Sequence, residues 1–210
     1  MRQVPVAARL ALAGLITAVA LAVALWPRGG DDTSVDGAQI HPSAPVPEQL
    51  RAAAGLAPCP RPAADAVGHG PLAGITLSCL ADGKPVDVAA ALAGKPALLN
   101  LWAYWCGPCA EELPYLQEYA QRAGNAITVL TVHSDPDEAR GLALLADLKV
   151  TLPGVLDAST RVRNAVGVPA VLPVSVLLRA DGSVAKAIVR PFDGVEDIAD
   201  TVANELGVAA

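Results

Sequence analysis

The strongest hydrophobic pattern in the chain is a largely apolar run from residue 97 to residue 102, just before a pair of cysteines. A run of this length predicts a strand that is buried on both faces. After the cysteines, Leu113, Leu116 and Tyr119 recur at the spacing of one helix face. The pattern therefore predicts a strand, a turn and a helix, with the two cysteines in the turn.

Alternating and β-rich runs elsewhere in the chain predict further strands. Asp82-Gly83 and Asp181-Gly182 predict the tight turns of two hairpins. The predicted strands cover residues 75–80, 86–88, 126–133, 174–179 and 184–189, with a short extended piece at Val155.

Helical spacing of apolar residues predicts further helices in the second half of the chain. One begins with Asp135 as its N-cap and Pro136 at its first position, and the others cover residues 159–166 and 194–206. Strand pairs therefore flank a strand-helix-strand crossover. This order predicts an α/β fold with a central mixed sheet, an N-terminal β-hairpin and helices on both faces.

The first residues of the chain have a different pattern. Residues 10–26 carry no charge, and they follow a segment, residues 1–9, that contains Arg2 and Arg9. This pattern predicts a transmembrane anchor with residues 1–9 on the cytoplasmic side. The alternative is a cleaved signal peptide, for which residues 26–28 (WPR) form a poor cleavage site.

A linker follows the predicted anchor. Residues 27–57 are rich in Gly, Pro, Ser and Asp, and they show no regular apolar spacing apart from a possible short helix at residues 49–56. We expect this linker to be extracytoplasmic and the folded domain to cover residues 58–210.

Composition and charge limit the classes of partner. The chain is 53% hydrophobic and 17% charged, which agrees with a segment in a membrane. Its formal net charge of -6 offers no basic surface for nucleic acid, so we expect no nucleic-acid partner. The even number of cysteines, 4, suggests one redox pair and one structural disulfide in an exported chain.

Cys106 and Cys109 have the spacing of a redox-active disulfide. A strand that leads into a helix places Cys106 at the helix N-terminus, where free N–H groups and the helix dipole stabilise a thiolate. Cys106 is then the predicted nucleophile, and Cys109 resolves the mixed disulfide. Pro108 fits the first helical turn, where its missing N–H has no cost.

The main structural alternative for this pair is half of a zinc site. Zinc would need two more ligands at metal-like spacing, but Cys59 and Cys79 stand far apart and the histidines His41, His69 and His133 are scattered. We therefore expect no metal, and no cofactor other than the disulfide itself. We expect a structural role for His133.

The sequence around these cysteines, residues 102–109 (WAYWCGPC) with residues 111–114 (EELP), resembles the active site of the thioredoxin superfamily. More narrowly, it is similar to the TlpA/ResA-type thiol-disulfide oxidoreductases. The resemblance covers about residues 75–206 and implies a thioredoxin-like fold. Pro114 lies where the family has a proline that kinks the helix.

The resemblance also implies where substrate binds. Leu172 and Pro173 match the family's cis-proline loop, which implies a cis Pro173 whose flanking backbone meets the redox pair and the substrate; Pro169 is the rival for this role. Other expected substrate contacts are Trp105, Gly107 and Pro108.

One departure from the cytoplasmic thioredoxins bears on proton transfer. Their buried aspartate is replaced here by Asn100, which cannot titrate. Glu112 lies where the membrane-anchored reductases resemble one another in having a carboxylate, so we expect it to take the proton from Cys109. The alternative for Glu112 is a solvated residue of the first helical turn.

Cys59 and Cys79 flank a loop rich in Pro and Gly. We expect a structural disulfide that joins the N-terminal segment to the sheet edge and stabilises the fold by about 3 kcal/mol. A weaker alternative is that this pair relays electrons to the active pair.

These observations predict an extracytoplasmic, single-pass membrane protein that reduces disulfides in other proteins through Cys106 and Cys109. The expected partners are exported proteins with disulfides or dithiols, and a membrane electron donor similar to the CcdA/DsbD proteins. One alternative is a disulfide oxidase or isomerase for exported proteins. Another is a non-catalytic module that binds a soft metal, which the single methionine of the chain disfavours.

Overall fold

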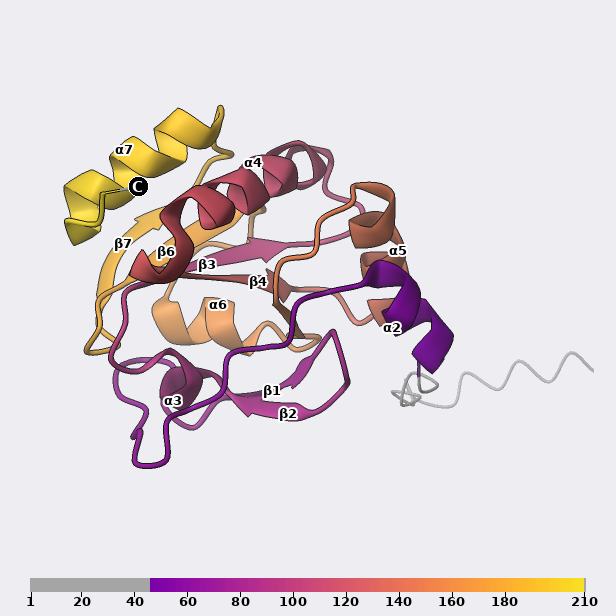
Figure 1. Ribbon diagram of the computed structural model, residues 1–210, viewed down its shortest axis with the longest axis horizontal. Helices are drawn as coiled ribbons and strands as arrows, with labels where there is room; N and C mark the ends of the chain where they lie inside the picture. Colours follow the sequence, from indigo (N-terminus) through magenta and orange to yellow (C-terminus); the bar gives the residue numbers. More distant parts are fainter. Residues whose placement is uncertain (1–45, 210) are drawn as a thin grey trace, which may run out of the picture. The chain divides into compact units, whose positions relative to one another are not determined.

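The computed structural model of the chain describes residues 46–209, which form one seven-stranded sheet with helices around it (Figure 1). The strands are β1 (Thr76–Cys79), β2 (Pro85–Asp87), β3 (Ala97–Trp102), β4 (Thr128–His133), β5 (Gly154–Leu156), β6 (Val174–Leu178) and β7 (Val184–Ile188). The helices are α2 (Glu48–Ala54), α3 (Val88–Leu92), α4 (Gly107–Ala123), α5 (Glu138–Asp147), α6 (Arg161–Val166) and α7 (Val195–Leu206), with a 3-10 turn, η1 (Gly124–Ala126).

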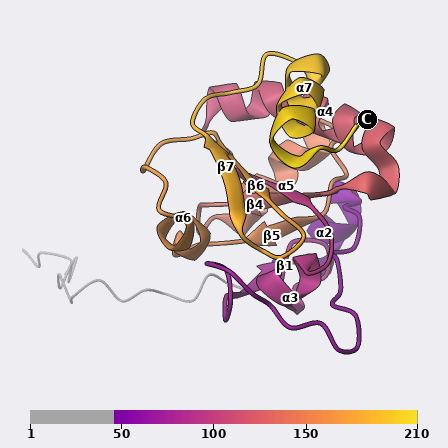
Figure 2. The same cartoon turned by 90° about the vertical axis from the view of Figure 1, so that its left-hand side faces the viewer.

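The sheet is mixed, as the order of predicted elements implied. Its strands follow the order β2-β1-β5-β4-β3-β6-β7. The central strands β3, β4 and β5 are parallel, whereas the hairpins β1–β2 and β6–β7 add antiparallel strands at the two sides. Figure 2 shows the β7 edge of the sheet toward the viewer. The predicted α/β fold is confirmed.

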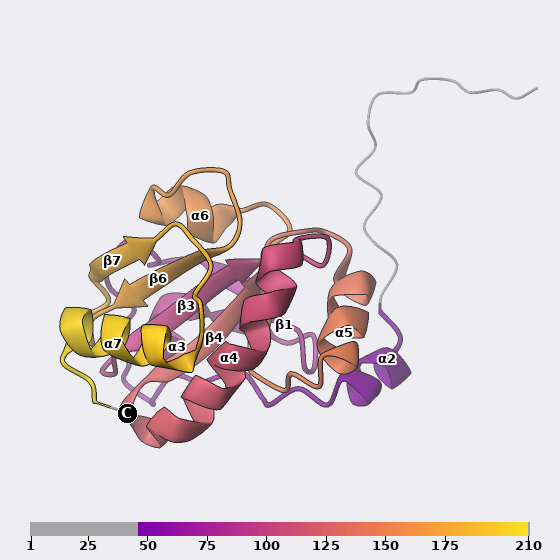
Figure 3. The same ribbon diagram turned by 90° about the horizontal axis from the view of Figure 1, so that it is seen from above.

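Helices cover both faces of the sheet. Helices α4, α5 and α7 contribute to one apolar cluster, and α3 and α6 contribute to another. Figure 3 shows α4, α5 and α7 across the same face, and Figure 1 shows α3 and α6 on the opposite side. The chain thus builds a three-layer structure with β3 and β4 at its centre.

Strand β3 is buried along its whole length, and its side chains alternate between the two layers. Leu98 and Trp102 pack in the cluster with α4, whereas Leu99 and Leu101 pack in the cluster with α3 and α6. Asn100 points toward α4 because successive residues of a strand face opposite sides. This alternation brings one polar side chain into the apolar layer beneath the redox helix.

The domain begins earlier than the sequence pattern indicated. Helix α2 packs on α5, with Ala54 buried in the core. Arg51 of α2 forms a salt bridge with Glu138 of α5 at 2.7 Å and donates a hydrogen bond to the carbonyl oxygen of Leu80 at 2.7 Å. The expected boundary at residue 58 is therefore corrected, since the end of the presumed linker belongs to the folded domain.

The anchor expected at residues 10–26 lies outside the described residues. Across residues 46–209, none of the helices combines the length and the apolar character needed to cross a membrane.

Two local predictions differ from the structure. Helix α5 begins at Glu138 rather than near Asp135, because Asp137 is the N-cap and its carboxylate accepts from the backbone N–H of Arg140. Helix α3 was not expected. It forms directly after β2 because Asp87 caps it by accepting from the N–H of Ala90.

His133, at the end of β4, is an internal packing residue. It is fully buried, and its ring lies 4.6 Å from that of Trp102 between centroids. Burial lowers the pKa of His133 from 6.5 to about 4, so the ring is neutral at neutral pH. A Cβ atom on Gly141 of α5 would lie only 2.8 Å from ring atom Cε1. The glycine therefore lets α5 approach the sheet closely.

This contact predicts the sign of one substitution. On helix propensity alone, Gly141→Ala would stabilise the protein by about 1 kcal/mol. We expect the opposite, a loss of about 1–3 kcal/mol in the free energy of unfolding, because the added methyl group overlaps the buried ring. Urea denaturation measures the change. The double variant Gly141→Ala/His133→Ala should lose less free energy of unfolding than the sum of the losses of the two single variants. A loss equal to that sum would argue against this contact.

Candidate active site

The redox pair lies where β3 leads into α4. Cys106 is the N-cap of α4 and forms a disulfide with Cys109, with an S–S distance of 2.02 Å. The backbone N–H of Cys109 donates to Sγ of Cys106 at 3.3 Å. Cys106 is 5% exposed to solvent, whereas Cys109 is fully buried, so only the sulfur of Cys106 can be reached from outside. The helix N-terminus at this sulfur favours negative charge on it.

The residues expected to contact substrate surround this turn. Gly107 and Pro108 form the exposed first positions of α4. Trp105 is 60% exposed, and its indole N–H donates to the carboxylate of Asp135 at 2.9 Å. Because Asp135 holds the indole, the Trp105 ring lies beside the redox turn in a defined position.

The loop before β6 completes the surface around the disulfide. The peptide bond between Leu172 and Pro173 is cis, as the resemblance implied for Pro173 rather than Pro169. Val174 pairs with Leu101 across the antiparallel β3–β6 register, which sets Pro173 beside the end of β3. The redox turn and the cis-proline loop therefore meet at the same end of two adjacent strands.

Glu112 is buried one helical turn beyond Cys109, so the acid and the second sulfur share one face of α4. Its oxygen Oε1 accepts from the Nδ2 group of Asn100 at 2.6 Å, and Oε2 accepts from the backbone N–H of Phe192 at 2.9 Å. The alternative of a solvated surface residue is therefore wrong.

Burial changes the acidity of the Glu112 carboxyl group. It raises the pKa of Glu112 from 4.5 to about 6, because the charged form loses its hydration. The hydrogen bonds from Phe192 and Asn100, and the positive charge of Arg190, act in the opposite direction and limit the rise. The carboxyl group therefore titrates close to neutral pH, as a general acid or base requires.

Asn100 can serve both protonation states of Glu112. Its Nδ2 group also donates to Oγ of Ser175 at 3.1 Å, while its Oδ1 atom has no hydrogen-bond partner among residues 46–209. Rotation of the amide by half a turn would present Oδ1 to Glu112. A protonated Glu112 could then donate to this oxygen, whereas the ionised form accepts from the amide nitrogen.

The sequence did not reveal Ser175 or Phe192 as parts of this site. Ser175 lies in the segment that matches the cis-proline loop, so its position was available but its contact with Asn100 was not. Phe192 contributes only a backbone N–H, 80 residues away from Glu112, and no side-chain signal could have identified it.

Comparison with known proteins agrees with this geometry. A model of the Redoxin family matches residues 63–203, which is most of the described part of the chain. The chain belongs to the Redoxin family.

Curated relatives narrow this assignment. Residues of this redoxin are 28% identical over 109 positions to "Thiol-disulfide oxidoreductase ResA" of Bacillus cereus, in a match that covers 51% of this chain and 62% of that protein. The match to ResA of Geobacillus thermodenitrificans is 33% identical over 96 residues and covers 45% of this chain and 55% of the relative. This redoxin is thus a TlpA/ResA-type member of the thioredoxin superfamily, although the matches span less than two thirds of these relatives.

A solved structure of similar fold comes from Mycobacterium tuberculosis. It is a secreted disulfide oxidoreductase described as homologous to Escherichia coli DsbE, 27% identical, with a TM-score of 0.53. That comparison covers 65% of this chain and 96% of the solved one. The similarity therefore extends over nearly all of the other protein.

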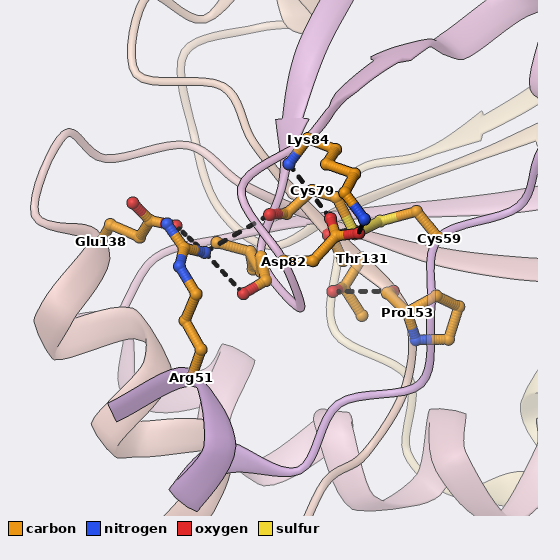
Figure 4. Close-up of a disulfide and its surroundings, with 10 residues drawn as sticks. Arg51, Cys59, Cys79, Asp82, Lys84, Thr131, Glu138 and Pro153 are labelled. Atoms are coloured by element: carbon orange, nitrogen blue, oxygen red, sulfur yellow. Dashed lines mark hydrogen bonds and ion pairs between the residues drawn. A yellow bond between two sulfur atoms is a disulfide. The ribbon is translucent and has the colours of Figure 1, made fainter. Parts of the chain in front are cut away.

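The second cysteine pair of the redoxin joins the N-terminal segment to the sheet. Cys59 and Cys79 form a disulfide with a Cα–Cα distance of 6.0 Å, so all four cysteines of the chain are paired. Cys59 precedes the region that matches the family, which begins at residue 63. Figure 4 shows this disulfide close to Arg51, whose guanidinium also reaches the carbonyl oxygen of Cys79 at 3.4 Å. The segment before β1 is therefore attached at two neighbouring points.

Loss of this disulfide has a predictable effect on stability. Cys59 and Cys79 are separated by 20 residues, so the variant Cys59→Ala/Cys79→Ala should lower the free energy of unfolding by about 3 kcal/mol. The matched control is Cys106→Ala/Cys109→Ala, which opens a loop with a separation of only 3 and should cost less. Urea denaturation of both variants measures the difference. Equal losses of unfolding free energy in the two variants would argue that chain entropy does not explain how the Cys59–Cys79 disulfide stabilises the fold.

The raised pKa of Glu112 predicts a pH dependence of stability. A carboxyl group with a higher pKa in the folded state favours folding when protonated, so its contribution is complete below about pH 4.5 and declines until about pH 6. The decline amounts to about 2 kcal/mol. Glu112→Gln should remove this component of the pH profile, whereas the exposed neighbour variant Glu111→Gln should keep it. Urea denaturation at pH 4 to 8 measures both, and an unchanged profile in Glu112→Gln would contradict the assignment.

Proposed function

We propose that this redoxin is a thiol-disulfide oxidoreductase that reduces disulfides of exported proteins outside the cytoplasm. The observation that carries the proposal is the Cys106–Cys109 disulfide at the N-terminus of α4, with the buried Glu112 one turn further along. The family assignment and the names of the ResA relatives support the same reaction.

The reaction begins with the reduced form of the redoxin. The Cys106 thiolate attacks one sulfur of a client disulfide, so that a bond forms between Cys106 and the client while the client's S–S bond breaks. The second client sulfur leaves as a thiolate and takes up a proton from solvent. The result is a mixed disulfide between redoxin and client.

Cys109 completes the reaction. Its thiol gives its proton to the Glu112 carboxylate, and the resulting thiolate attacks Sγ of Cys106. This step forms the Cys106–Cys109 disulfide and releases the client's first sulfur as a thiolate. Two electrons have then moved from the redoxin to the client. The amide of Asn100 keeps a hydrogen bond to Glu112 in each protonation state, which lowers the cost of holding the proton inside the protein.

The cis-proline loop positions the client. The backbone next to Pro173 offers an extended edge to a client segment, which can pair with it as an added strand. Trp105, Gly107 and Pro108 are exposed beside the reacting sulfur and would contact the apolar part of that segment. Together these groups hold the client disulfide in line with Cys106.

The proposed location depends on the N-terminal segment. Residues 10–26 would act as a single transmembrane anchor, and residues 1–9 would remain in the cytoplasm. A reductase in an oxidising compartment needs a source of electrons, so a membrane donor of the CcdA/DsbD type is the expected partner. The Mycobacterium tuberculosis neighbour, named as a secreted protein, supports an extracytoplasmic setting.

The direction of electron transfer is tested by the reduction potential of the Cys106–Cys109 pair. Equilibration of the full-length chain, in a neutral detergent, with glutathione and dithiothreitol buffers gives this value. For a reductase with Gly107-Pro108 between its cysteines, the reduction potential should be about -270 mV, the value of thioredoxin. A potential of about -120 mV, typical of strong oxidants, would instead favour an oxidase for exported proteins.

The roles of the three groups are separated by variants. Cys109→Ser should accumulate a mixed disulfide with a model disulfide peptide, visible by mass, because no second thiol resolves it. Cys106→Ser should accumulate none, since Cys109 is buried. Glu112→Gln should slow turnover at pH 7 by at least roughly tenfold, since it cannot accept the proton, with Glu111→Gln as the control. Accumulation on Cys106→Ser rather than on Cys109→Ser would reverse the assigned roles of the cysteines.

A further inference from the structure

A cavity of roughly 370 Å³ opens beside the redox turn, away from the buried acid. Trp105 and Leu172, which flank the disulfide in the two neighbouring loops, line it together with Val171, Thr160 and Arg163. Trp105 and Val171 are 60% and 50% exposed, so the cavity has apolar walls that are open to a client. It is therefore continuous with the surface on which the client segment would lie.

Arg163 gives this cavity a positive charge with unused hydrogen-bond donors. Its guanidinium is partly buried and donates through Nη2 to the hydroxyl of Thr160 at 3.2 Å. Within residues 46–209, no carboxylate lies within the 4.0 Å of a salt bridge to Arg163, in contrast to Arg122, Arg140 and Arg190. A guanidinium carries five N–H donors in a planar fork, so most of those on Arg163 are free.

The start of helix α6, two residues before Arg163, is held in place by a short hydrogen-bond network. Asp157 accepts from the backbone N–H groups of Arg161 and Val162 through its two oxygens, at 2.8 Å each. Both carboxylate oxygens therefore accept hydrogen bonds at the start of α6, and Asp157 forms no salt bridge with Arg163. The cation faces the cavity from a helix whose position is set by these bonds.

We propose that this cavity binds an acidic side chain of the client protein, close in sequence to the client's reactive cysteine. The proposal rests on the proposed function, because the cavity adjoins the redox pair and would be filled by the segment that Cys106 attacks. A carboxylate matches the guanidinium fork in shape and charge, and it can accept two parallel hydrogen bonds. The apolar walls hold the methylene groups of a glutamate.

The size of the cavity limits the position of the acidic residue. Its volume corresponds to a width of roughly 7 Å, which an extended chain crosses in about two residues at about 3.3 Å per residue. The acidic residue is therefore expected within about two residues of the reactive cysteine. The net charge of -6 would repel an acidic client at long range, so any preference for acid must come from this local contact.

The test uses disulfide peptides that differ at one position. Each peptide carries Glu, Gln or Lys at one of the three positions on either side of a cysteine, and all are reduced by the full-length chain in a neutral detergent. At the best position we expect the second-order rate constant for Glu to exceed that for Gln by about threefold to tenfold, and Lys to be slowest. In 0.5 M NaCl the difference should shrink.

Variants assign the preference to one residue. Arg163→Gln should bring the Glu to Gln ratio close to one, and Arg163→Glu should favour the Lys peptide. The matched control is Arg179→Gln, which removes an equal charge at the other end of β6 from Leu172 and should keep the wild-type ratio. A wild-type ratio that persists in Arg163→Gln would overturn the proposal.

A separate reaction distinguishes failure of the cavity from failure of the enzyme. Exchange with dithiothreitol, which is neutral and too small to reach Arg163 while it reacts, reports on the redox pair alone. If the wild type exchanges with dithiothreitol and reduces all peptides at equal rates, the acidic subsite is refuted and the proposed function stands. If the wild type does not exchange with dithiothreitol either, the proposed function fails and the subsite fails with it.

Discussion

Burial of the Glu112 carboxylate is the constraint on which the arrangement around the redox pair depends. An ionised carboxyl group inside a protein is costly unless hydrogen bonds replace its lost hydration. The donors come from Asn100 on β3 and from the backbone of Phe192, in the loop between β7 and α7. Helix α4, the central strand and this loop must therefore keep their relative positions whenever the acid is charged.

This arrangement places two kinds of chemistry on one rigid element. The redox sulfurs begin helix α4 and the Glu112 carboxyl group follows one turn later, so their separation is set by helix geometry. In the proposed function, most of the groups that would contact a client come from other segments, namely the Trp105 turn, the cis-proline loop and α6. The reacting atoms are thereby held by a helix, while recognition is assigned to segments that can vary without disturbing them.

Much of the redox turn could be predicted because its information is local. The spacing of Cys106 and Cys109 between an apolar run and a helix pattern was enough to locate it, and the resemblance identified Glu112 and Pro173. The environment of Glu112 could not be predicted, because Ser175 and Phe192 reach it only through strand pairing and loop packing. Helix α3 was missed for a different reason, since its run of alanines after Asp87 shows no amphipathic spacing.

The entry of the chain into the domain was also predicted only in part. The disulfide between Cys59 and Cys79 was expected from the cysteine count, but the packing of α2 on α5 depends on Arg51, whose partners lie far along the chain. A single charged residue in a region of loop-like composition gives no indication that it will be partly buried against a distant helix. Helix α2 therefore became part of the domain only once its tertiary contacts were known.

The contact between Asn100 and Glu112 has a consequence for how such sites diverge. The two side chains meet at 2.6 Å, so an aspartate in place of Asn100 would set two carboxyl groups against each other. They could share one proton, but both could not be ionised at that distance. A buried acid can therefore occupy the strand or the helix, and an evolutionary move from one position to the other must pass through a form that carries both acids or neither.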